Sequence, residues 1–223
     1  MIGRPLLITD CDEVLLHMVR HFGEWLTQAH AIDFRPVGGQ FAEALRHRHN
    51  GEVVPPERVW PLLDGFFATE MARQTLVPHA REAIARIAAV ADVVILTNLG
   101  EHNLAARSGQ LAALGIDHRV VCNGHGPKGA AVRALLDEYR PSVAAFVDDL
   151  AWHHASVAEA APHIFRLHMV AEPSIAPDVP PAPAAHARID DWTQAADWLL
   201  ARFAGVPLDA AAAPTEGDAH EHR

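Results

Sequence analysis

The stretch Leu6-Leu-Ile-Thr-Asp10-Cys-Asp12-Glu13 joins four residues of apolar or β-branched character to a group of carboxylates. The run Leu6–Thr9 is typical of a buried strand in a parallel sheet, and the acidic residues begin where that strand is expected to end. Asp10 and Asp12 are two residues apart, so in an extended chain their side chains project to the same side. This stretch therefore predicts a buried strand that presents two carboxylates at its carboxyl end.

Strands and helices alternate along the chain from Pro78 onward. The further predicted strands are Asp92–Asn98, Arg119–Cys122, Val143–Val147 and His163–His168. The predicted helices between and after them are His79–Val90, Glu101–Leu114, Lys128–Tyr139, Ala151–Ala161 and Asp190–Phe203. Short strands that alternate with helices of this length indicate right-handed crossovers and a parallel sheet with helices on both faces. The predicted fold class is a Rossmann-like α/β domain.

The segment between the first two strands has a different pattern. Apolar residues recur at helical spacing in His17–His30, Gln40–His47 and Glu57–Thr75, which predicts an all-helical insertion. We expect an α/β core formed by residues 1–14 and 77–205, and a helical domain formed by residues 15–76. Residues 206–223 contain an alanine run followed by polar residues, and we expect them to be disordered.

Polar residues follow each of the predicted strands that surround the first one. Thr97 and Asn98 end the second strand, Lys128 begins a helix after the third, and Asp148-Asp149 end the fourth. In open α/β sheets ligands bind at the carboxyl ends of the strands, so these groups are expected to converge with Asp10 and Asp12. Crowded carboxylates repel each other unless a cation lies among them, and oxygen ligands suit Mg²⁺.

The lysine at position 128 is the only lysine in the chain, whereas there are 17 arginines. Lysine and arginine are not equivalent where a compact charge must fit a small site. An aspartate that attacks phosphorus would form an aspartyl-phosphate, and a second aspartate could protonate the leaving oxygen and later activate water. Lys128, Thr97 and Mg²⁺ would then bind the phosphoryl oxygens.

These residues occur in the order Asp10-Cys-Asp12-Glu-Val-Leu, Leu96-Thr97-Asn98, Lys128 and Phe146-Val-Asp148-Asp149. In that order they resemble the four motifs of the haloacid dehalogenase-like (HAD) superfamily of hydrolases, and the resemblance covers residues 5 to 170. It implies that Asp10 is the nucleophile and Asp12 the general acid and base. It also implies that Thr97, Asn98 and Lys128 bind the phosphoryl group.

The resemblance also implies a metal site and a cap. Asp149, with Asp148 beside it, would bind Mg²⁺ together with Asp10 and the backbone carbonyl of Asp12. The helical insertion resembles the C1-type cap of this superfamily, which closes over the site and sets substrate choice. A lid that excludes water is a reasonable partner for phosphoryl chemistry.

Two positions depart from the pattern of the superfamily. Glu13 stands where a glycine is usual, and His153 stands four residues after Asp149, where aspartate or asparagine is frequent. Glu13 could face the substrate. His17 and His21 share a helical face, which permits metal binding or contact with the substrate, although packed or solvated roles are the more common use of histidine. Glu13, His17 and His21 are therefore candidate substrate residues.

Composition limits the classes of partner. The 223 residues include 28 acidic and 18 basic ones, for a formal net charge of −10, which disfavours a nonspecific grip on nucleic acid. The first apolar run ends within a few residues, too early for a signal peptide or a membrane span. With only two cysteines, a reducing compartment is expected, and we predict a cytoplasmic protein that binds neither membranes nor nucleic acid.

The predicted function is a Mg²⁺-dependent phosphatase that acts on a small phosphorylated metabolite through an aspartyl-phosphate. A haloacid dehalogenase is disfavoured because that chemistry has no use for Asp12 as an acid. A phosphomutase with the same residues remains open, as does a non-catalytic module that binds a phosphometabolite or a partner. The sequence predicts neither the substrate nor the oligomeric state.

Overall fold

The computed structural model describes residues 3–35 and 42–208, and a six-stranded sheet forms its centre. The strand order is β5-β4-β1-β6-β7-β8, and every neighbouring pair is parallel. The strands are β1 (Leu6–Thr9), β4 (Asp92–Thr97), β5 (Arg119–Cys122), β6 (Ala144–Asp148), β7 (Phe165–His168) and β8 (Ala187–Arg188). The predicted Rossmann-like parallel sheet is therefore confirmed, with β8 as an additional edge strand.

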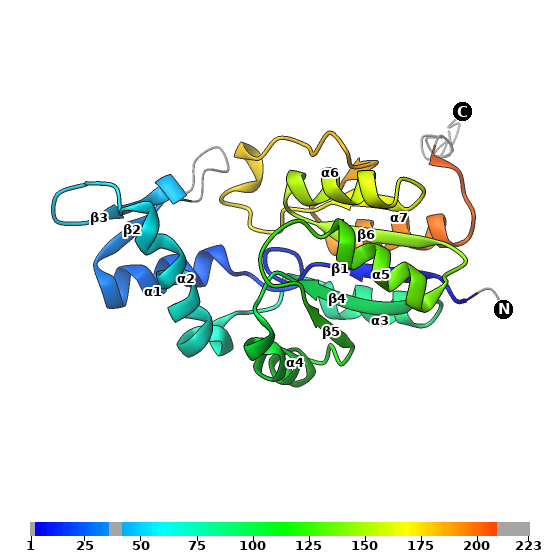
Figure 1. Ribbon diagram of the computed structural model, residues 1–223, viewed down its shortest axis with the longest axis horizontal. Helices are drawn as coiled ribbons and strands as arrows, with labels where there is room; N and C mark the ends of the chain where they lie inside the picture. The colour runs from blue at the N-terminus through cyan, green and yellow to red at the C-terminus, as the bar shows by residue number, and fades with distance from the viewer. Residues whose placement is uncertain (1–2, 36–41, 209–223) are drawn as a thin grey trace, which may run out of the picture.

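Helices cover both faces of the sheet. Successive residues of a strand point to opposite sides, so the apolar strands pack against helices on both faces. The helices are α3 (Ala80–Ala88), α4 (Leu104–Ala113), α5 (Gly129–Tyr139), α6 (Ala151–Ala160) and α7 (Trp192–Phe203). In β1, Leu6 and Ile8 belong to the apolar cluster formed with α5 and α6. Leu7 belongs to the opposite cluster, which includes residues of α3 and α7 (Figure 1). The central strand is thus buried on both sides.

The last helix also fixes the loop that follows β1. Asp191 accepts a hydrogen bond from the backbone N–H of Gln194 and so caps the start of α7. Trp192, at the first position of that helix, is fully buried, and its indole N–H donates to the backbone carbonyl of Val14 at 2.7 Å. A residue near the end of the sequence therefore holds the acidic loop in place.

Most residues of another apolar cluster, such as Phe22, Phe66 and Leu45, belong to the segment between β1 and α3, and Leu99 after β4 joins them. It contains α1 (Val19–His30), β2 (Ile32–Phe34), β3 (Leu45–His47) and α2 (Pro56–Glu70), with short 3-10 turns at Ala42–Ala44 and Met71–Arg73. The all-helical prediction is wrong here, because β2 and β3 form an antiparallel pair. Ile32 of β2 and Leu45 of β3 are both buried in this cluster.

The two chain segments that connect the insertion to the sheet lie side by side. The backbone N–H of His17 donates to Thr75, and the N–H of Val77 donates to Leu15, both at 2.9 Å. Figure 1 shows the insertion on the left, beside the edge of the sheet at which β1 ends. Side chains add to this connection, because the Gln110 side-chain amide of α4 donates to the backbone carbonyl of Met71 at 2.5 Å. The boundaries proposed between core and cap stay a prediction.

Other parts of the chain differ from expectation in smaller ways. The Pro- and Ala-rich stretch 172–186 is a loop with one 3-10 turn at Ala176–Asp178. The predicted tail, residues 206–223, lies outside the described residues from position 209 onward. Both cysteines, Cys11 and Cys122, are free thiols.

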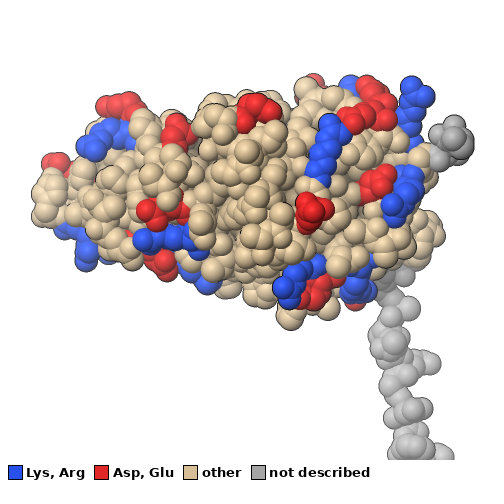
Figure 2. Space-filling view, turned by 90° about the horizontal axis from the view of Figure 1, so that it is seen from below, with Lys and Arg blue, Asp and Glu red and all other residues tan. Residues whose placement is uncertain are grey.

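Charged side chains of both signs alternate on the surface drawn in Figure 2. Several exposed arginines pair with carboxylates, such as Arg81 with Glu82 and Arg86 with Asp197. Such exposed pairs contribute little to stability. None of the helices within the described ranges is sufficiently long and apolar to cross a membrane.

Candidate active site

The three central strands end at the residues predicted to carry the chemistry. Asp10 directly follows β1, Thr97 is the last residue of β4, and Asp148 is the last residue of β6. Because β4 and β6 flank β1 in register, these ends meet at one edge of the sheet. Lys128 precedes the first residue of α5 and reaches the same place.

Lys128 connects the first and last acidic motifs. Its Nζ lies 2.7 Å from Asp10 Oδ1 and 2.7 Å from Asp148 Oδ2, and its side chain is fully buried. Burial alone would lower the pKa of this lysine, but attraction to Asp10 and Asp148 outweighs burial and raises it. The ammonium group is therefore charged, and the structure brings Lys128 together with Asp10 and Asp148 but not into contact with Asp12.

The Asp10 carboxyl group has one committed and one available oxygen. Oδ1 faces Lys128 and accepts a hydrogen bond from the backbone N–H of Cys11 at 2.7 Å. Oδ2 has no hydrogen-bond or ion-pair partner among the described residues. Burial raises the pKa of Asp10 to about 6 despite the opposing effect of Lys128. Asp10 is thus ionised near neutral pH, with one oxygen free to react.

Asp148 and Asp149 form the other side of the acidic cluster. Asp148 Oδ1 accepts the backbone N–H of Leu150 at 2.9 Å, whereas the Asp149 carboxyl makes no hydrogen bond or ion pair within the described part of the chain. Burial, followed by repulsion from Asp148 and Asp10, raises the pKa of Asp149 well above its usual value. Oxygens of Asp10, Asp148 and Asp149 all lie within 4.8 Å of one another. An all-oxygen set with one unpartnered carboxyl group fits Mg²⁺.

Two histidines hold the backbone of this acidic pair. His154 Nε2 donates to the carbonyl oxygen of Asp148 at 3.0 Å, and His168 Nε2 lies 2.8 Å from the carbonyl oxygen of Asp149. The His168 tautomer is fixed, because its Nδ1 accepts the backbone N–H of Ala182. Both rings therefore position the Asp148-Asp149 turn through its main chain.

Asp12 is paired with a buried arginine. Arg107 Nη2 contacts Asp12 Oδ1 at 2.9 Å and Oδ2 at 3.0 Å, and the Gln74 side-chain amide donates to Oδ1 at 2.6 Å. Arg107 is fully buried and its guanidinium carbon lies 5.5 Å from the centre of the Phe67 ring. Arg107 also donates to Gln74 Oε1, so the three side chains form one network. This network joins the acidic loop to α4 and to the end of the insertion.

The two residues after Leu96 differ in their surroundings. The Thr97 side chain is 1% exposed and makes no hydrogen bond among the described residues, which leaves its hydroxyl for a ligand. The Asn98 amide instead donates to the carbonyl of Gly126 at 3.0 Å and accepts from Asn123 at 2.8 Å. It also lies 3.3 Å from His153 Nε2. Asn98 therefore holds the loop before Lys128, and its role toward phosphate stays a prediction.

The three candidate substrate residues have other contacts. Glu13 has a φ of 62°, in the left-handed region, and its Oε1 accepts the backbone N–H groups of Met18 and Val19 at 2.6 Å each. His17 lies beside Glu172, 3.3 Å away. His21 contacts Thr75 Oγ1 and Glu24. His17 and His21 thus have separate partners, and the metal pair suggested by their spacing is not formed.

Sequence reasoning missed Arg107, Gln74, His168 and Glu172. Arg107 is one of 17 arginines, and nothing in its helical pattern distinguishes it from an exposed residue. Glu172 lies at the start of the Pro- and Ala-rich loop, where charged residues are usual. His168 ends a predicted strand next to β6, and that position was the one available signal for a residue near the site.

Comparison with known proteins gives similarity in structure alone. No family model and no curated protein sequence matches the chain. A proposed HAD-hydrolase from Bacillus subtilis, YfnB, solved with magnesium bound, matches 89% of this chain and 99% of its own with a TM-score of 0.61 at 12% identity. A proposed phosphoglycolate phosphatase from Lactobacillus plantarum matches 88% of this chain and 99% of its own, with a TM-score of 0.57 at 14% identity.

A third similar structure has a different activity in its name. The 2-haloacid dehalogenase from Pseudomonas syringae pv. Tomato DC3000 matches 91% of this chain and 100% of its own, with a TM-score of 0.54 at 16% identity. At such low identity the likeness concerns the fold, since one fold hosts many reactions. Together with the strand order and the residues at the strand ends, these matches show that the chain has the fold of the haloacid dehalogenase-like superfamily of hydrolases.

Proposed function

We propose that this chain is a Mg²⁺-dependent phosphatase that hydrolyses a small phosphorylated metabolite through an aspartyl-phosphate intermediate. The observation that carries the proposal is the position of Lys128 Nζ, 2.7 Å from both Asp10 Oδ1 and Asp148 Oδ2. A buried ammonium held between the two acidic motifs leaves Asp10 Oδ2 available and supplies positive charge where phosphoryl oxygens would lie.

In the first step, Asp10 Oδ2 forms a bond to phosphorus while the bond from phosphorus to the leaving oxygen breaks. Asp12 gives its proton to that oxygen, and the product alcohol departs. In the second step, water attacks the phosphorus, Asp12 accepts the proton of the water, and the bond between Asp10 and phosphorus breaks. Inorganic phosphate is released and Asp10 is restored.

The remaining residues bind the phosphoryl group and offset its charge. Lys128 and the free Thr97 hydroxyl would contact equatorial oxygens. Asp10, Asp148, Asp149 and the backbone carbonyl of Asp12 would hold Mg²⁺, which when bound reduces the repulsion between these carboxylates and the phosphoryl group.

Arg107 sets a condition on Asp12. Its two contacts match the ionised carboxylate, which is the form that accepts a proton in the second step. To donate a proton in the first step, Asp12 must be protonated and must leave at least one of these contacts. Because Gln74 also binds Asp12 and lies at the end of the insertion, movement of the insertion would change this network.

The test is the hydrolysis of p-nitrophenyl phosphate with and without Mg²⁺. We expect turnover that needs Mg²⁺ and is abolished in Asp10→Asn. Asp12→Asn is expected to accumulate phosphoenzyme with this activated substrate, because its breakdown lacks a base. An Asp10→Asn variant that keeps the wild-type rate would contradict the assignment.

A second assay separates the alternatives. A 2-haloacid is incubated with the protein, and halide release is measured beside phosphate release from a panel of phosphomonoesters. Halide release that survives Asp12→Asn, with no phosphate release from any substrate, would replace the phosphatase by a dehalogenase. Return of the phosphoryl group to a hydroxyl group of the substrate, without release of phosphate to water, would favour a phosphomutase.

A further inference from the structure

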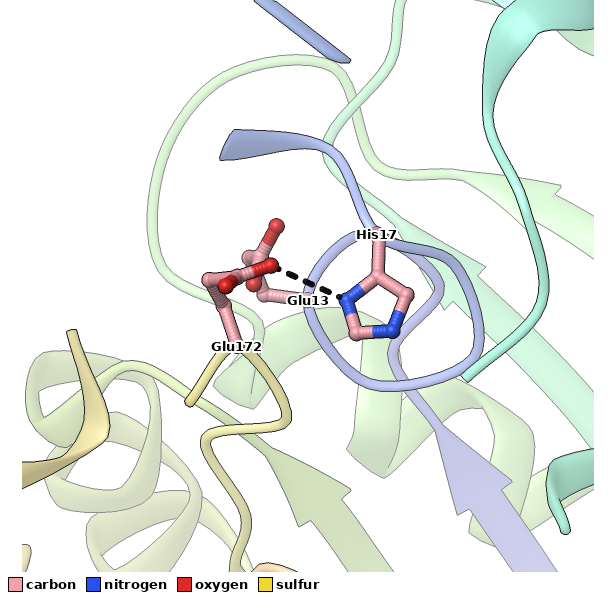
Figure 3. A group of neighbouring side chains, drawn as sticks. All are labelled: Glu13, His17 and Glu172. Carbon is pink, nitrogen blue, oxygen red and sulfur yellow. Dashed lines mark ion pairs between the residues drawn. The ribbon is translucent and has the colours of Figure 1, made fainter. Parts of the chain in front are cut away.

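A second group of potential ligands lies beside the acidic loop, outside the network of Asp10 and Lys128. Glu13, His17 and Glu172 each offer one ligand atom, and these atoms lie within 4.8 Å of one another. The three residues are 2%, 4% and 4% exposed. Figure 3 shows the His17 ring facing the two carboxyl groups, which come from the loop after β1 and the loop after β7.

Each side chain has an atom directed into the cluster and left without a hydrogen bond. Glu13 Oε1 is held by two backbone N–H groups, but the buried Glu13 Oε2 has no partner. His17 Nδ1 and Glu172 Oε2 lie 3.3 Å apart, yet their geometry is not that of a hydrogen bond. Buried polar atoms are nearly always paired, so three such atoms facing one another indicate a missing partner.

The charges of the cluster favour a cation as that partner. Two carboxylates meet there, and Arg20, whose Nη2 lies 3.1 Å from Glu172 Oε2, is the neighbouring cation; its side chain is 45% exposed. Glu172 Oε1 is already bound by Ser174, so its remaining oxygen is the one that faces His17. Arg20 thus pairs with Glu172, whereas Glu13 has no ion pair among the described residues and its Oε2 has no hydrogen bond. Burying unpaired negative charge is costly unless a cation compensates it.

The kind of donor selects the kind of ion. Zn²⁺ accepts both imidazole nitrogen and carboxylate oxygen as ligands, whereas Mg²⁺ prefers oxygen ligands alone. We propose that Glu13, His17 and Glu172 bind a divalent transition-metal ion such as Zn²⁺, at a site separate from the Mg²⁺ site of Asp10, Asp148 and Asp149.

This site would join three parts of the chain. Glu13 belongs to the acidic loop, His17 to the segment that enters the insertion, and Glu172 to the loop after β7. The backbone N–H of Ala171 also donates to the carbonyl of Glu13 at 3.1 Å. An ion here would tie the segment that enters the insertion to two loops at the edge of the sheet. A groove of about 420 Å³ is lined in part by Arg20 and Ser174, both of which contact Glu172.

The experiment measures zinc binding to the full chain and does not depend on phosphatase activity. Protein stripped with a chelator is dialysed against Zn²⁺ in excess Mg²⁺, and bound zinc is measured by mass spectrometry. We expect His17→Gln to bind one Zn²⁺ per chain fewer than the wild type, and Glu172→Gln to bind that ion at least about tenfold more weakly. Zinc should raise the melting temperature of the wild type and of neither variant.

Two variants serve as controls. His21→Gln, in the first turns of α1, should bind as much zinc as the wild type, and so should Asp149→Asn. Equal zinc in the wild type, His17→Gln and Glu172→Gln would overturn the proposal, as would loss of the ion in Asp149→Asn alone. If His17→Gln does not fold, as judged by circular dichroism, Glu172→Gln carries the same comparison.

Discussion

The guanidinium group of Arg107 contacts both carboxylate oxygens of Asp12, at 2.9 and 3.0 Å, from a fully buried side chain. Replacement by methionine would keep much of the apolar volume and leave the Asp12 carboxylate without its counter-charge. We expect Arg107→Met to lower the free energy of unfolding by about 3 kcal/mol, as for other broken buried pairs. Urea denaturation measures this change.

An exposed pair provides the matched control for Arg107. The Arg81–Glu82 ion pair has a similar N–O distance of 2.8 Å, but its side chains are 57% and 58% exposed. Arg81→Met should change stability by less than about 1 kcal/mol. Equal losses in the two variants would mean that the Asp12 pair contributes no more than a surface contact.

The contrast between Lys128 and Arg107 shows what the sequence could predict at the site. Lys128 could be placed because parallel strands bring their carboxyl ends to one edge, so the order of motifs determines which residues meet. Arg107 could not be placed, because its contact with Asp12 depends on which face of α4 packs toward the acidic loop. That choice is made by tertiary packing across 95 positions of sequence separation.

The insertion shows the same limit for secondary structure. Ala42, Glu43, Ala44 and Leu45 favour a helix, and that local preference led to the wrong prediction over 40–47. The Asn50-Gly51 dipeptide was an overlooked signal for a turn. In the structure Gly51 has a φ of 74°, and the backbone N–H of Val54 donates to Leu45 across that turn. β3 therefore pairs on one side with β2 and on the other with the segment after this turn, and this pairing outweighs the local preference.

Lys128 is also the basis of a prediction about Mg²⁺. In Lys128→Met, Asp10 and Asp148 lose the cation that they share, so the cluster becomes more negative. The variant should be less stable than the wild type without metal, and Mg²⁺ should raise its melting temperature by more than it raises that of the wild type. Thermal unfolding with and without Mg²⁺ measures both effects.

The added variant Lys128→Met/Asp149→Asn controls for nonspecific ion effects. Removing the Asp149 charge takes away one predicted ligand, so the additional stabilisation by Mg²⁺ should be lost. If Mg²⁺ stabilises the wild type and Lys128→Met equally, the lysine and the ion do not share these carboxylates.

Two glycines in helices provide a paired test of how α5 places Lys128. A Cβ atom at Gly129 would lie 2.4 Å from the backbone oxygen of Ser156 in α6, whereas at Gly109 in α4 it would meet nothing within 4 Å. Gly129→Ala must push α5 away from α6, and we expect a loss of about 1–3 kcal/mol in stability together with a lower kcat for phosphate release. Gly109→Ala should gain up to about 1 kcal/mol and leave kcat unchanged. Denaturation and the phosphatase assay check both, and a harmless Gly129→Ala would disprove the close approach of α5 and α6.

We expect the folded chain to lose stability in acid because of His154, which is fully buried between Phe146 and His168. Burial lowers the pKa of His154 to about 4, and repulsion from His168 and Arg166 adds to this, although the bond to the Asp148 carbonyl opposes it. The unfolded chain, with a usual histidine pKa near 6.5, therefore binds a proton between pH 6.5 and 4 that the folded chain excludes. This contribution to stability is complete above pH 6.5 and is lost as the pH falls toward 4, by on the order of 3 kcal/mol.

The substitution His154→Gln isolates this effect, because an amide can still donate to the Asp148 carbonyl but cannot be protonated in this range. Its free energy of unfolding, measured by urea titration from pH 7.5 to 4.5, should fall less steeply with acid than that of the wild type. His163→Gln replaces an exposed histidine and should follow the wild-type curve. Parallel curves for all three proteins would mean that His154 does not contribute to acid lability, and that the Asp148-Asp149 turn keeps its support in acid.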